Sequence, residues 1–249
     1  MDSATGALDR TSSGSVINPY DRYALEAALQ AAAALSDTHR AVEVIAVSMG
    51  PPSAEQVLRE ALAMGAERAI LLSDPAFSGS DVSATSLALA GVFEAETLPD
   101  LIFCGQQTTD GDTAQLPFAL AARLKIPVMG WVKKIEYFRP DEFSVLQEFS
   151  GGTVRAVGAY PALFAIGREG LQPRAPNLSR RLAAQKMPVE VWKLKELSNS
   201  DPLKYGFSGS PTKVRKVYTP DFTAKNPPLF LKTAEAAALI TEALEKVTL

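Results

Sequence analysis

The stretch VEVIAVSMGPPSAEQVLREALAMGAERAILLSD, residues 42–74, decides the fold. Each end of it is an apolar run typical of a buried strand. The middle has helical periodicity, with Ser53 placed as an N-cap and Gly65 as a C-cap. The expected elements are a strand over 42–50, a helix over 53–65 and a strand over 66–74. This order predicts a right-handed βαβ unit, and therefore a parallel sheet.

The same alternation continues on both sides of that stretch. Upstream, NPYDRYALEAALQAAAAL predicts a helix with Asn18 as N-cap, Pro19 at the first helical position and Asp21 in the first turn. Downstream, the expected elements are a helix over 81–95, a strand over 100–105 and a helix over 113–124. Ligands of such sheets bind at the carboxyl ends of the strands, which here are the loops 48–51, 73–80 and 105–112.

The pattern changes after Pro127. Four β-rich runs separated by turns favour an antiparallel addition to the sheet: VMGWVKKIEYF, EFSVLQEF, TVRAVGAY and ALFAIG. The segment 170–192 begins with prolines, becomes a short basic helix and ends in a strand. The fold class predicted is α/β, a Rossmann-like parallel-sheet domain with an antiparallel β addition and a C-terminal arm plus helix.

The C-terminal arm has little capacity to form a core of its own. Residues 198–228 hold five prolines and few apolar patterns, so we expect them to lie on another surface. That surface is either a partner subunit or the chain's own domain, and the sequence favours neither. An amphipathic helix is expected over 233–247, with Thr233 as its cap.

Composition narrows the classes of function. Of 249 residues 47% are hydrophobic, and the net charge of −3 argues against a general binder of nucleic acid or membrane surfaces. No run of about 18 apolar residues occurs, so no membrane span is expected. The single cysteine, Cys104, excludes an internal disulfide and fits a reducing, cytoplasmic compartment. The single histidine, His39, disfavours a zinc site or a histidine relay, so no catalytic or metal-binding residue is assigned.

Two acids stand out in LIFCGQQTTDGDTAQLP, residues 101–117. Asp110 and Gly111 favour a tight turn, and Asp112 is placed to cap a helix that starts at Thr113. Three interpretations stay open: a nucleotide loop, a purely structural turn and cap, or a metal or catalytic site at the two acids. Divalent metal sites usually need more oxygen ligands than this stretch offers.

The same loop has the composition of a nucleotide-binding loop. A helix N-terminus suits a phosphate, and Gly105 allows a ligand to approach the end of the strand. The residues that add hydrogen-bonding groups are Gln106, Gln107, Thr108, Thr109 and Thr113. No Walker-type lysine accompanies them, so no phosphoryl-transfer machinery is expected.

A second loop, SDPAFSGSDVSAT over 73–85, follows the same order of strand end, glycine and serine, then helix. Ser80 or Asp81 would cap the helix, and Phe77 could stack on a ring. A plain connecting loop is an equal alternative.

Four stretches together resemble the β subunit of electron transfer flavoproteins. They are INPYDRYALEAAL, VIAVSMGPPSAEQVLREALAMGAERAILLSD, DLIFCGQQTTDGDTAQLP and APNLSRRLAAQKMPVEVW. The resemblance runs from about Gly6 to Pro220 and covers most of the chain. In that family the β subunit forms one α/β domain, pairs with an α subunit that carries FAD, and itself holds AMP or, in electron-bifurcating members, a second FAD.

The resemblance implies a set of nucleotide contacts. They fall on Asn18, Pro19, Tyr20, Asp21, Met49, Gly105, Gln106, Gln107, Thr108, Thr109, Asp110, Gly111, Asp112, Thr113, Ala114, Gln115 and Leu116. The segment that widens the pocket for a flavin in bifurcating members adds Phe77, Gly79, Ser80, Asp81 and Thr85.

The resemblance also implies partners. The partner-recognition loop matches 170–186, in which Leu178 takes the place of the leucine that anchors a partner dehydrogenase. The chain is accordingly divided into a nucleotide-binding domain, 1–197, and an arm and helix, 198–249, that pack on the partner subunit.

The function implied is electron transfer with an α subunit. FAD is favoured over AMP, and in a bifurcating member NADH would be the substrate, with ferredoxin and an acyl-CoA dehydrogenase-like protein as acceptors. The alternative within the family is a β subunit that holds a structural AMP. Outside it, the alternative is a stand-alone adenine-nucleotide sensor.

Three departures from the family pattern bear on these expectations. The apolar strand with which the family usually opens has no counterpart in MDSATGALDR, and a missing strand would expose a sheet edge and a pocket wall. Gln106 stands where a basic residue is common, which puts one phosphate contact in doubt. Ser179 replaces the usual proline after Leu178, and two arginines follow, so partner choice is expected to differ.

Overall fold

The computed structural model describes residues 15–37, 41–109, 111–213 and 230–247, in two units, residues 1–215 and 216–249. His39 and Asp110, both singled out from the sequence, lie outside the described residues. In the second unit, α7 (Thr233–Val247) confirms the helix expected there. Its large apolar side chains stand exposed, and these are Leu239, Ile240 and Leu244.

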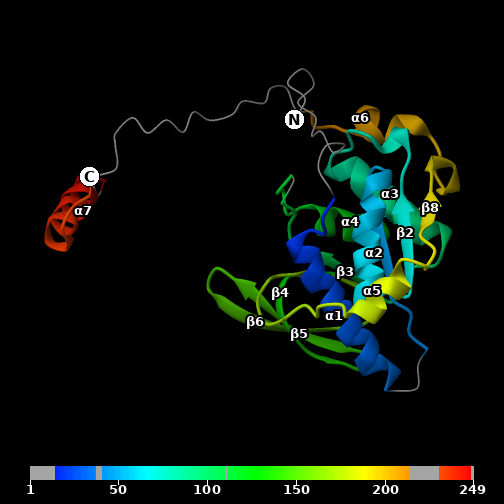
Figure 1. The fold of residues 1–249 in the computed structure, drawn as a ribbon, viewed down its shortest axis with the longest axis horizontal. Helices are drawn as coiled ribbons and strands as arrows, with labels where there is room; N and C mark the ends of the chain where they lie inside the picture. Colours follow the sequence, from blue (N-terminus) through cyan, green and yellow to red (C-terminus); the bar gives the residue numbers. More distant parts are fainter. Residues whose placement is uncertain (1–14, 38–40, 110, 214–229, 248–249) are drawn as a thin grey trace. The chain divides into compact units, whose positions relative to one another are not determined.

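The first unit alternates helices and strands along most of its length (Figure 1). Its α-helices are α1 (Pro19–Ser36), α2 (Glu55–Met64), α3 (Val82–Ala95), α4 (Leu116–Leu124), α5 (Leu178–Ala184) and α6 (Gly206–Gly209). Its strands are β1 (Ile45–Met49), β2 (Arg68–Leu72), β3 (Leu101–Gly105), β4 (Val128–Phe138), β5 (Phe143–Phe149), β6 (Gly152–Gly158), β7 (Ala162–Ile166) and β8 (Glu190–Trp192). Short 3₁₀ turns are η1 (Pro52–Ala54), η2 (Pro75–Phe77), η3 (Leu194–Glu196) and η4 (Pro202–Lys204).

The strands form two sheets, with orders β1-β2-β8 and β3-β7-β4-β5-β6. β1, β2 and β8 run parallel, as do β3, β7 and β4, while β5 and β6 extend the second sheet antiparallel. The predicted α/β class and the antiparallel addition are confirmed. The prediction is wrong for the last of the four β-rich runs, because β7 returns between β3 and β4. Its five residues are all buried, as expected of a central parallel strand covered on both faces.

Helices cover both faces of the sheets. Along β2, Ala69 and Leu71 pack with α2 and α5, whereas Ile70 and Leu72 pack with α3. Along β7, Phe164 packs towards α1 while its neighbour Leu163 packs towards α3 and α4. Successive side chains of a strand point to opposite faces, so this alternation shows three layers, with α1, α2 and α5 on one side and α3 and α4 on the other.

The middle layer is interrupted between β1 and β3. Among the described residues β1 pairs with β2 alone and β3 with β7 alone, so each presents an unpaired edge. A cavity of about 940 Å³ lies between them, lined by both strands and by alanines of α1. Within the part of the chain that the structure describes, these two facing edges agree with the exposed sheet edge expected from the sequence.

The helix of the opening stretch begins later than predicted. Ser53 lies inside the 3₁₀ turn η1, and α2 starts at Glu55 without a side-chain cap. Gly65 ends the helix as predicted, because its φ of 137° is one that residues with a Cβ rarely adopt.

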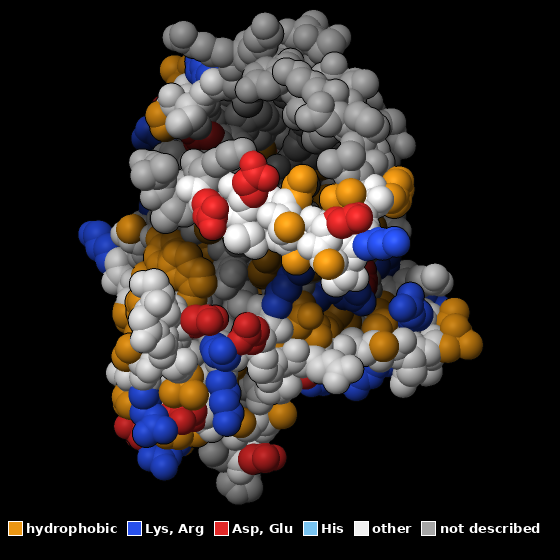
Figure 2. Space-filling model, turned by 90° about the vertical axis from the view of Figure 1, so that its left-hand side faces the viewer, with side chains coloured by type: hydrophobic (Ala, Val, Ile, Leu, Met, Phe, Trp, Pro, Cys, Tyr) orange, Lys and Arg blue, Asp and Glu red, His pale blue; other side chains and the backbone are white. Residues whose placement is uncertain are grey.

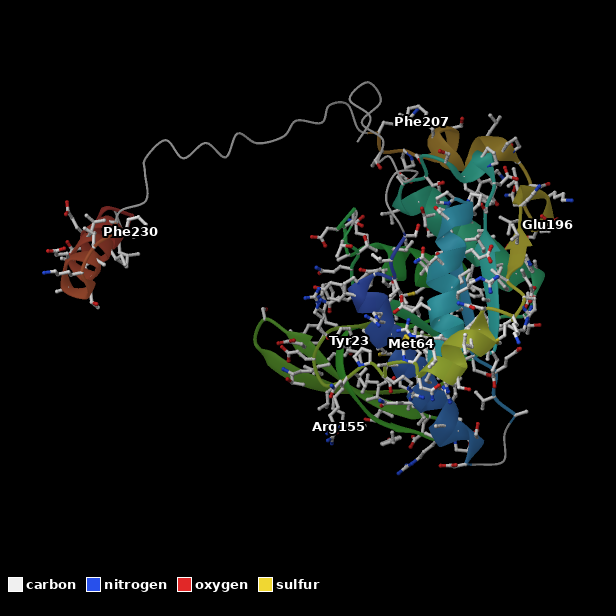
Figure 3. The ribbon with its side chains drawn as sticks, viewed as in Figure 1. Tyr23, Met64, Arg155, Glu196, Phe207 and Phe230 are labelled. Carbon is white, nitrogen blue, oxygen red and sulfur yellow. The ribbon has the colours of Figure 1, made fainter. Side chains whose placement is uncertain are left out.

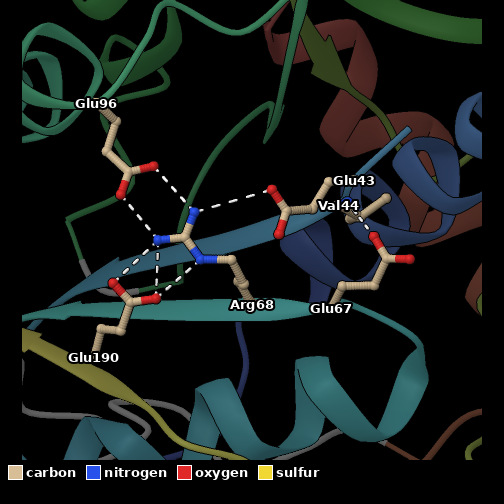
Figure 4. Close-up of polar contacts among 6 residues, drawn as sticks. All are labelled: Glu43, Val44, Glu67, Arg68, Glu96 and Glu190. Atoms are coloured by element: carbon tan, nitrogen blue, oxygen red, sulfur yellow. Dashed lines mark hydrogen bonds and ion pairs between the residues drawn. The ribbon is translucent and has the colours of Figure 1, made fainter. Parts of the chain in front are cut away.

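One arginine holds the amino-terminal end of β2 to its surroundings (Figure 4). Arg68 donates to both oxygens of Glu96 and both of Glu190, which joins β2 to the residue after α3 and to β8. These bonds raise the pKa of Arg68 and lower the pKa of Glu96. The cluster lies at the opposite strand end from the predicted ligand loops, so it is a structural clamp.

Residues just after the predicted boundary at 197 pack on the domain. Tyr205 is 1% exposed, and its ring meets Phe77 edge-on at 5.6 Å between centroids. The hydroxyl of Ser210 accepts a hydrogen bond from the Asp81 amide at 2.8 Å. Phe207, by contrast, is 61% exposed, and its position can be followed in Figure 3. For residues 198–213, own-domain packing is the alternative that the structure shows.

Candidate functional site

A cluster of hydrogen bonds, the polar knot, joins the start of α1 to the end of β3. Its members are Asn18, Asp21, Gly105 and Gln107. The Gly105 amide donates to Asp21 Oδ1 at 2.7 Å, and Asn18 Nδ2 donates to Asp21 Oδ2 and to the Gln107 carbonyl, each at 2.9 Å. A Cβ on Gly105 would lie 2.6 Å from the Tyr20 Cβ. The glycine therefore allows α1, rather than a ligand, to approach the strand end. Two predicted loops, 18–21 and 105–107, are thus brought together.

Asn18 occupies the N-cap position of α1, as predicted, but its side chain makes no capping bond. Its two amide hydrogens are used by Asp21 and Gln107. Asn18 Oδ1 is buried and accepts no hydrogen bond from the described residues. A buried acceptor without a donor costs about 1–3 kcal/mol, so this atom fits a ligand that offers an amino or hydroxyl group. Adenine and ribose both offer one, and the residues therefore fit an adenine nucleotide.

The polar knot stands at one end of the cavity between β1 and β3. The predicted residues that line this cavity are Asn18, Asp21, Met49, Thr108 and Thr109. Burial raises the pKa of Asp21 despite the hydrogen bonds it accepts. Burial, with the nearby Asp21, also raises the pKa of the Cys104 thiol to about 12, so Cys104 is not a thiolate at neutral pH. The lining is otherwise mainly apolar, with alanines of α1 and side chains of β1.

The predicted cap on the loop before α4 is wrong. α4 begins at Leu116, not Thr113, and its N-cap residue, Gln115, makes no side-chain capping bond. Asp112 is exposed and has a φ of 45°, and Ala114 has a φ of 52°. Pro117 at the start of α4 explains the later beginning, because proline suits the first turn and disfavours helix before it.

The loop after β2 faces the C-terminal segment rather than the cavity. Asp81 caps α3 as predicted, accepting from the Ala84 amide at 3.1 Å, and its other oxygen accepts from Thr212. Phe77 is 5% exposed beneath Tyr205, and a Cβ on Gly79 would touch Phe207. The buried position of Phe77 contradicts the expectation that its ring is available for stacking.

Other predicted contacts lie near the knot or on the loop without lining the cavity. They are Pro19, Tyr20, Gly105, Gln106, Gln107, Gly111, Asp112, Thr113, Ala114, Gln115 and Leu116, together with Ser80 and Thr85 on the loop and helix after β2. No group of three or more His, Cys, Asp or Glu side chains that could hold a metal occurs in the described part of the chain.

The predicted partner-recognition loop presents a fixed helix. Arg59 donates to the carbonyls of Ala184 and Gln185 at 3.0 Å, and Arg180 donates to the Met64 carbonyl at 3.2 Å, so α5 is held against α2. Leu178, its first residue, is 72% exposed. Figure 2 shows a different face, the one on the left in Figure 1, where hydrophobic side chains lie among charged side chains of both signs.

An ion pair that the sequence did not reveal anchors the start of this loop. Arg174 donates to both carboxylate oxygens of Glu26, at 2.7 and 2.9 Å, and Glu26 also accepts from Gln30. Burial acts to raise the pKa of Glu26, but the bonds from Arg174 and Gln30 hold it below its ordinary value. The partners are 148 positions apart, and the only sequence signal was an acid on the apolar face of α1.

Comparison with known proteins agrees with this arrangement. Residues 5–197 match the model of the electron transfer flavoprotein domain. Protein FixA of Azorhizobium caulinodans is 38% identical, over 97% of this chain and 87% of its own length. The electron transfer flavoprotein subunit beta of Megasphaera elsdenii is 35% identical, over 93% and 86%. Subunit CarD of the caffeyl-CoA reductase-Etf complex of Acetobacterium woodii is 37% identical, over 88% and 82%. No helix in the described residues is both long and apolar enough to cross a membrane. The chain belongs to the electron transfer flavoprotein family, among its β subunits.

Proposed function

We propose that this chain holds an adenine nucleotide at the carboxyl ends of β1 and β3 and transfers electrons together with an α subunit. The observation that carries the proposal is the buried Asn18 Oδ1 at the polar end of the cavity, for which the described residues offer no donor. Nucleotides bind at this edge of parallel sheets, and a ligand amino or hydroxyl group would satisfy the acceptor. Family membership disfavours the stand-alone sensor.

The nucleotide we propose is FAD, in a bifurcating complex. NADH would be the electron donor, with ferredoxin and an acyl-CoA dehydrogenase-like protein as acceptors. The similarity to a subunit of a caffeyl-CoA reductase-Etf complex supports coupling to a CoA-ester reductase or dehydrogenase. A bound flavin would supply the redox chemistry, while this chain supplies binding, orientation and electrostatics. The exposed Leu178 on the fixed helix α5 would contact the partner.

A structural AMP is the second candidate, and one observation favours it. The loop that the resemblance connects with a flavin pocket is packed against residues 205–212, with Phe77 buried under Tyr205. In this arrangement no residue of the loop 73–85 lines the cavity. Either nucleotide would use the same knot of Asn18, Asp21 and Gly105.

Substitution of Asn18 tests the site. Calorimetric titration of the full chain, freed of copurified nucleotide, should show binding of AMP and FAD. Asn18→Leu removes the acceptor atom Oδ1 and both hydrogen bonds that the side chain donates. It should lower the affinity for both ligands at least about tenfold. Asn199→Leu changes the same side chain in a segment outside the cavity and should leave both affinities unchanged. Equal binding by the Asn18→Leu protein would reject this site.

A further inference from the structure

Arg168 lies where β7 and β3 end together. It follows β7 after Gly167, and Gly105 at the end of β3 pairs in register with Ile166 at the end of β7. The Gln106 amide donates to the Ile166 carbonyl at 3.0 Å, and a Cβ on Gly167 would lie 3.1 Å from Gln106 Oε1. Arg168 is therefore next to the proposed nucleotide loop, on the side of Gln106.

The guanidinium of Arg168 is held by an aromatic ring and not by a carboxylate. Its Cζ lies 4.5 Å from the centroid of the Tyr20 ring, in the first turn of α1. The described structure shows no hydrogen bond or ion pair for Arg168, whereas the adjoining acid, Glu169, is paired with Lys133. Stacking on a ring fixes the plane of a guanidinium and leaves its N–H groups free for a bidentate anion.

The surrounding charges leave room for an anion. Asp21, which follows Tyr20 on α1, accepts hydrogen bonds from the Gly105 amide and from Asn18, and burial raises the pKa of its carboxyl group. Gln106 is neutral, so the loop after β3 brings no cation of its own at that position. A positive partner would strengthen the binding of a nucleotide phosphate here, and among the described residues Arg168 is a cation with no carboxylate paired to it.

We infer that Arg168 is a phosphate-binding residue of the nucleotide site, oriented by Tyr20. The inference rests on the proposed function and assigns a residue outside the set expected from the sequence. It also answers the doubt raised by Gln106, because the charge comes from the neighbouring strand end. The ligand group recognised is a phosphate or diphosphate ester of adenosine.

Comparison of AMP with adenosine isolates the phosphate contact. In calorimetric titrations of the full chain, Arg168→Gln should lower the affinity for AMP about tenfold. The affinity for adenosine should change less than about twofold, because adenosine has no phosphate. Arg168→Lys keeps the charge without the planar fork and should lose part of the AMP affinity. The tenfold effect should shrink as salt is raised.

Arg139→Gln is the matched control. Arg139 also stacks on a tyrosine, with its Cζ 4.3 Å from the Tyr137 ring centroid, but in the turn between β4 and β5. The Arg139→Gln substitution should leave the affinities for AMP and adenosine unchanged. Equal weakening of AMP and adenosine by Arg168→Gln, or no weakening of either, would overturn the inference while the nucleotide site stands. Failure of the unsubstituted chain to bind adenosine and AMP would overturn the proposed function and this inference with it.

Discussion

At the scale of single residues, the site depends on how closely α1 approaches β3. Gly105 was expected to make room for a ligand, yet the structure uses that room for Tyr20 and the Asp21 amide. A glycine at a strand end signals close approach of some group, but the sequence does not say which one. The contact partner comes from a helix some 80 positions upstream, as the Asp21–Gly105 bond shows.

Gly105→Ala should destabilise the protein by about 1–3 kcal/mol, because the new methyl group overlaps Tyr20 and pushes α1 from the strand end. Urea unfolding followed by circular dichroism measures the change. Gly151→Ala is the control, since a Cβ there meets nothing within 4 Å. A Gly105→Ala protein as stable as the Gly151→Ala protein would contradict this account of the contact.

Asp112 and Asp81 show that an aspartate placed before a predicted helix does not always cap it. An aspartate before a predicted helix favours a cap, but Pro117 delays α4 to Leu116 and leaves Asp112 outside the helix with a φ of 45°. Asp81 satisfies the same rule and does cap α3, because no proline intervenes. Asn18 was correctly placed at the start of α1, while its donors serve Asp21 and Gln107.

At the scale of elements, the ion pair between Glu26 and Arg174 joins α1 to the start of the loop that carries Leu178. Glu26 is buried and has a pKa below its ordinary value of 4.5. A depressed carboxyl pKa stabilises the fold above the unfolded-state pKa, and the stabilisation is lost as the pH falls through the folded-state pKa.

The Glu26→Gln substitution should therefore lower the free energy of unfolding by about 1–2 kcal/mol at neutral pH. The expected loss is modest because Arg174 is partly exposed. Denaturant melts between pH 8 and pH 3 should show a constant difference down to about pH 5, which then narrows. A difference that stays constant below pH 4 would mean that the carboxylate charge is not what stabilises this contact.

The segment after residue 197 supplies a second element-scale test. Tyr205 is buried against Phe77, while its near neighbour Phe207 is exposed. Tyr205→Ala should lower stability by about 3–5 kcal/mol, and Phe207→Ala by less than about 1 kcal/mol. Similar thermal midpoints for the two variants would contradict packing of this segment on its own domain.

At the scale of the whole molecule, the sequence predicts the βαβ order and therefore the parallel sheet, since hydrophobic periodicity distinguishes the strands from the helices. The sequence does not predict that β7 lies between β3 and β4. A short apolar run has the same pattern in any buried strand, so the pattern does not indicate the strand's position in the sheet. The sequence also places Phe77 in a ligand pocket, whereas Tyr205, over a hundred positions later, covers it. Long-range packing of this kind leaves no local signal.

The interrupted sheet should be visible in solution. Among the strands that the structure describes, β1 and β3 have no partner on the side that faces the cavity, whereas β2 and β7 are paired on both sides. Hydrogen exchange should therefore be faster in peptides covering 45–49 and 101–105 than in those covering 68–72 and 162–166. Equal protection in the four peptides would show that the two edges are paired in solution.

The central claim is that this chain, paired with an α subunit, holds an adenine nucleotide of its own. Its most direct test is to purify the α/β pair, record the absorption spectrum, and quantify every released nucleotide per heterodimer. The account predicts two FAD per pair. One FAD with one AMP would keep the site and assign it to the structural nucleotide. A pair with one FAD and no second nucleotide would contradict the claim.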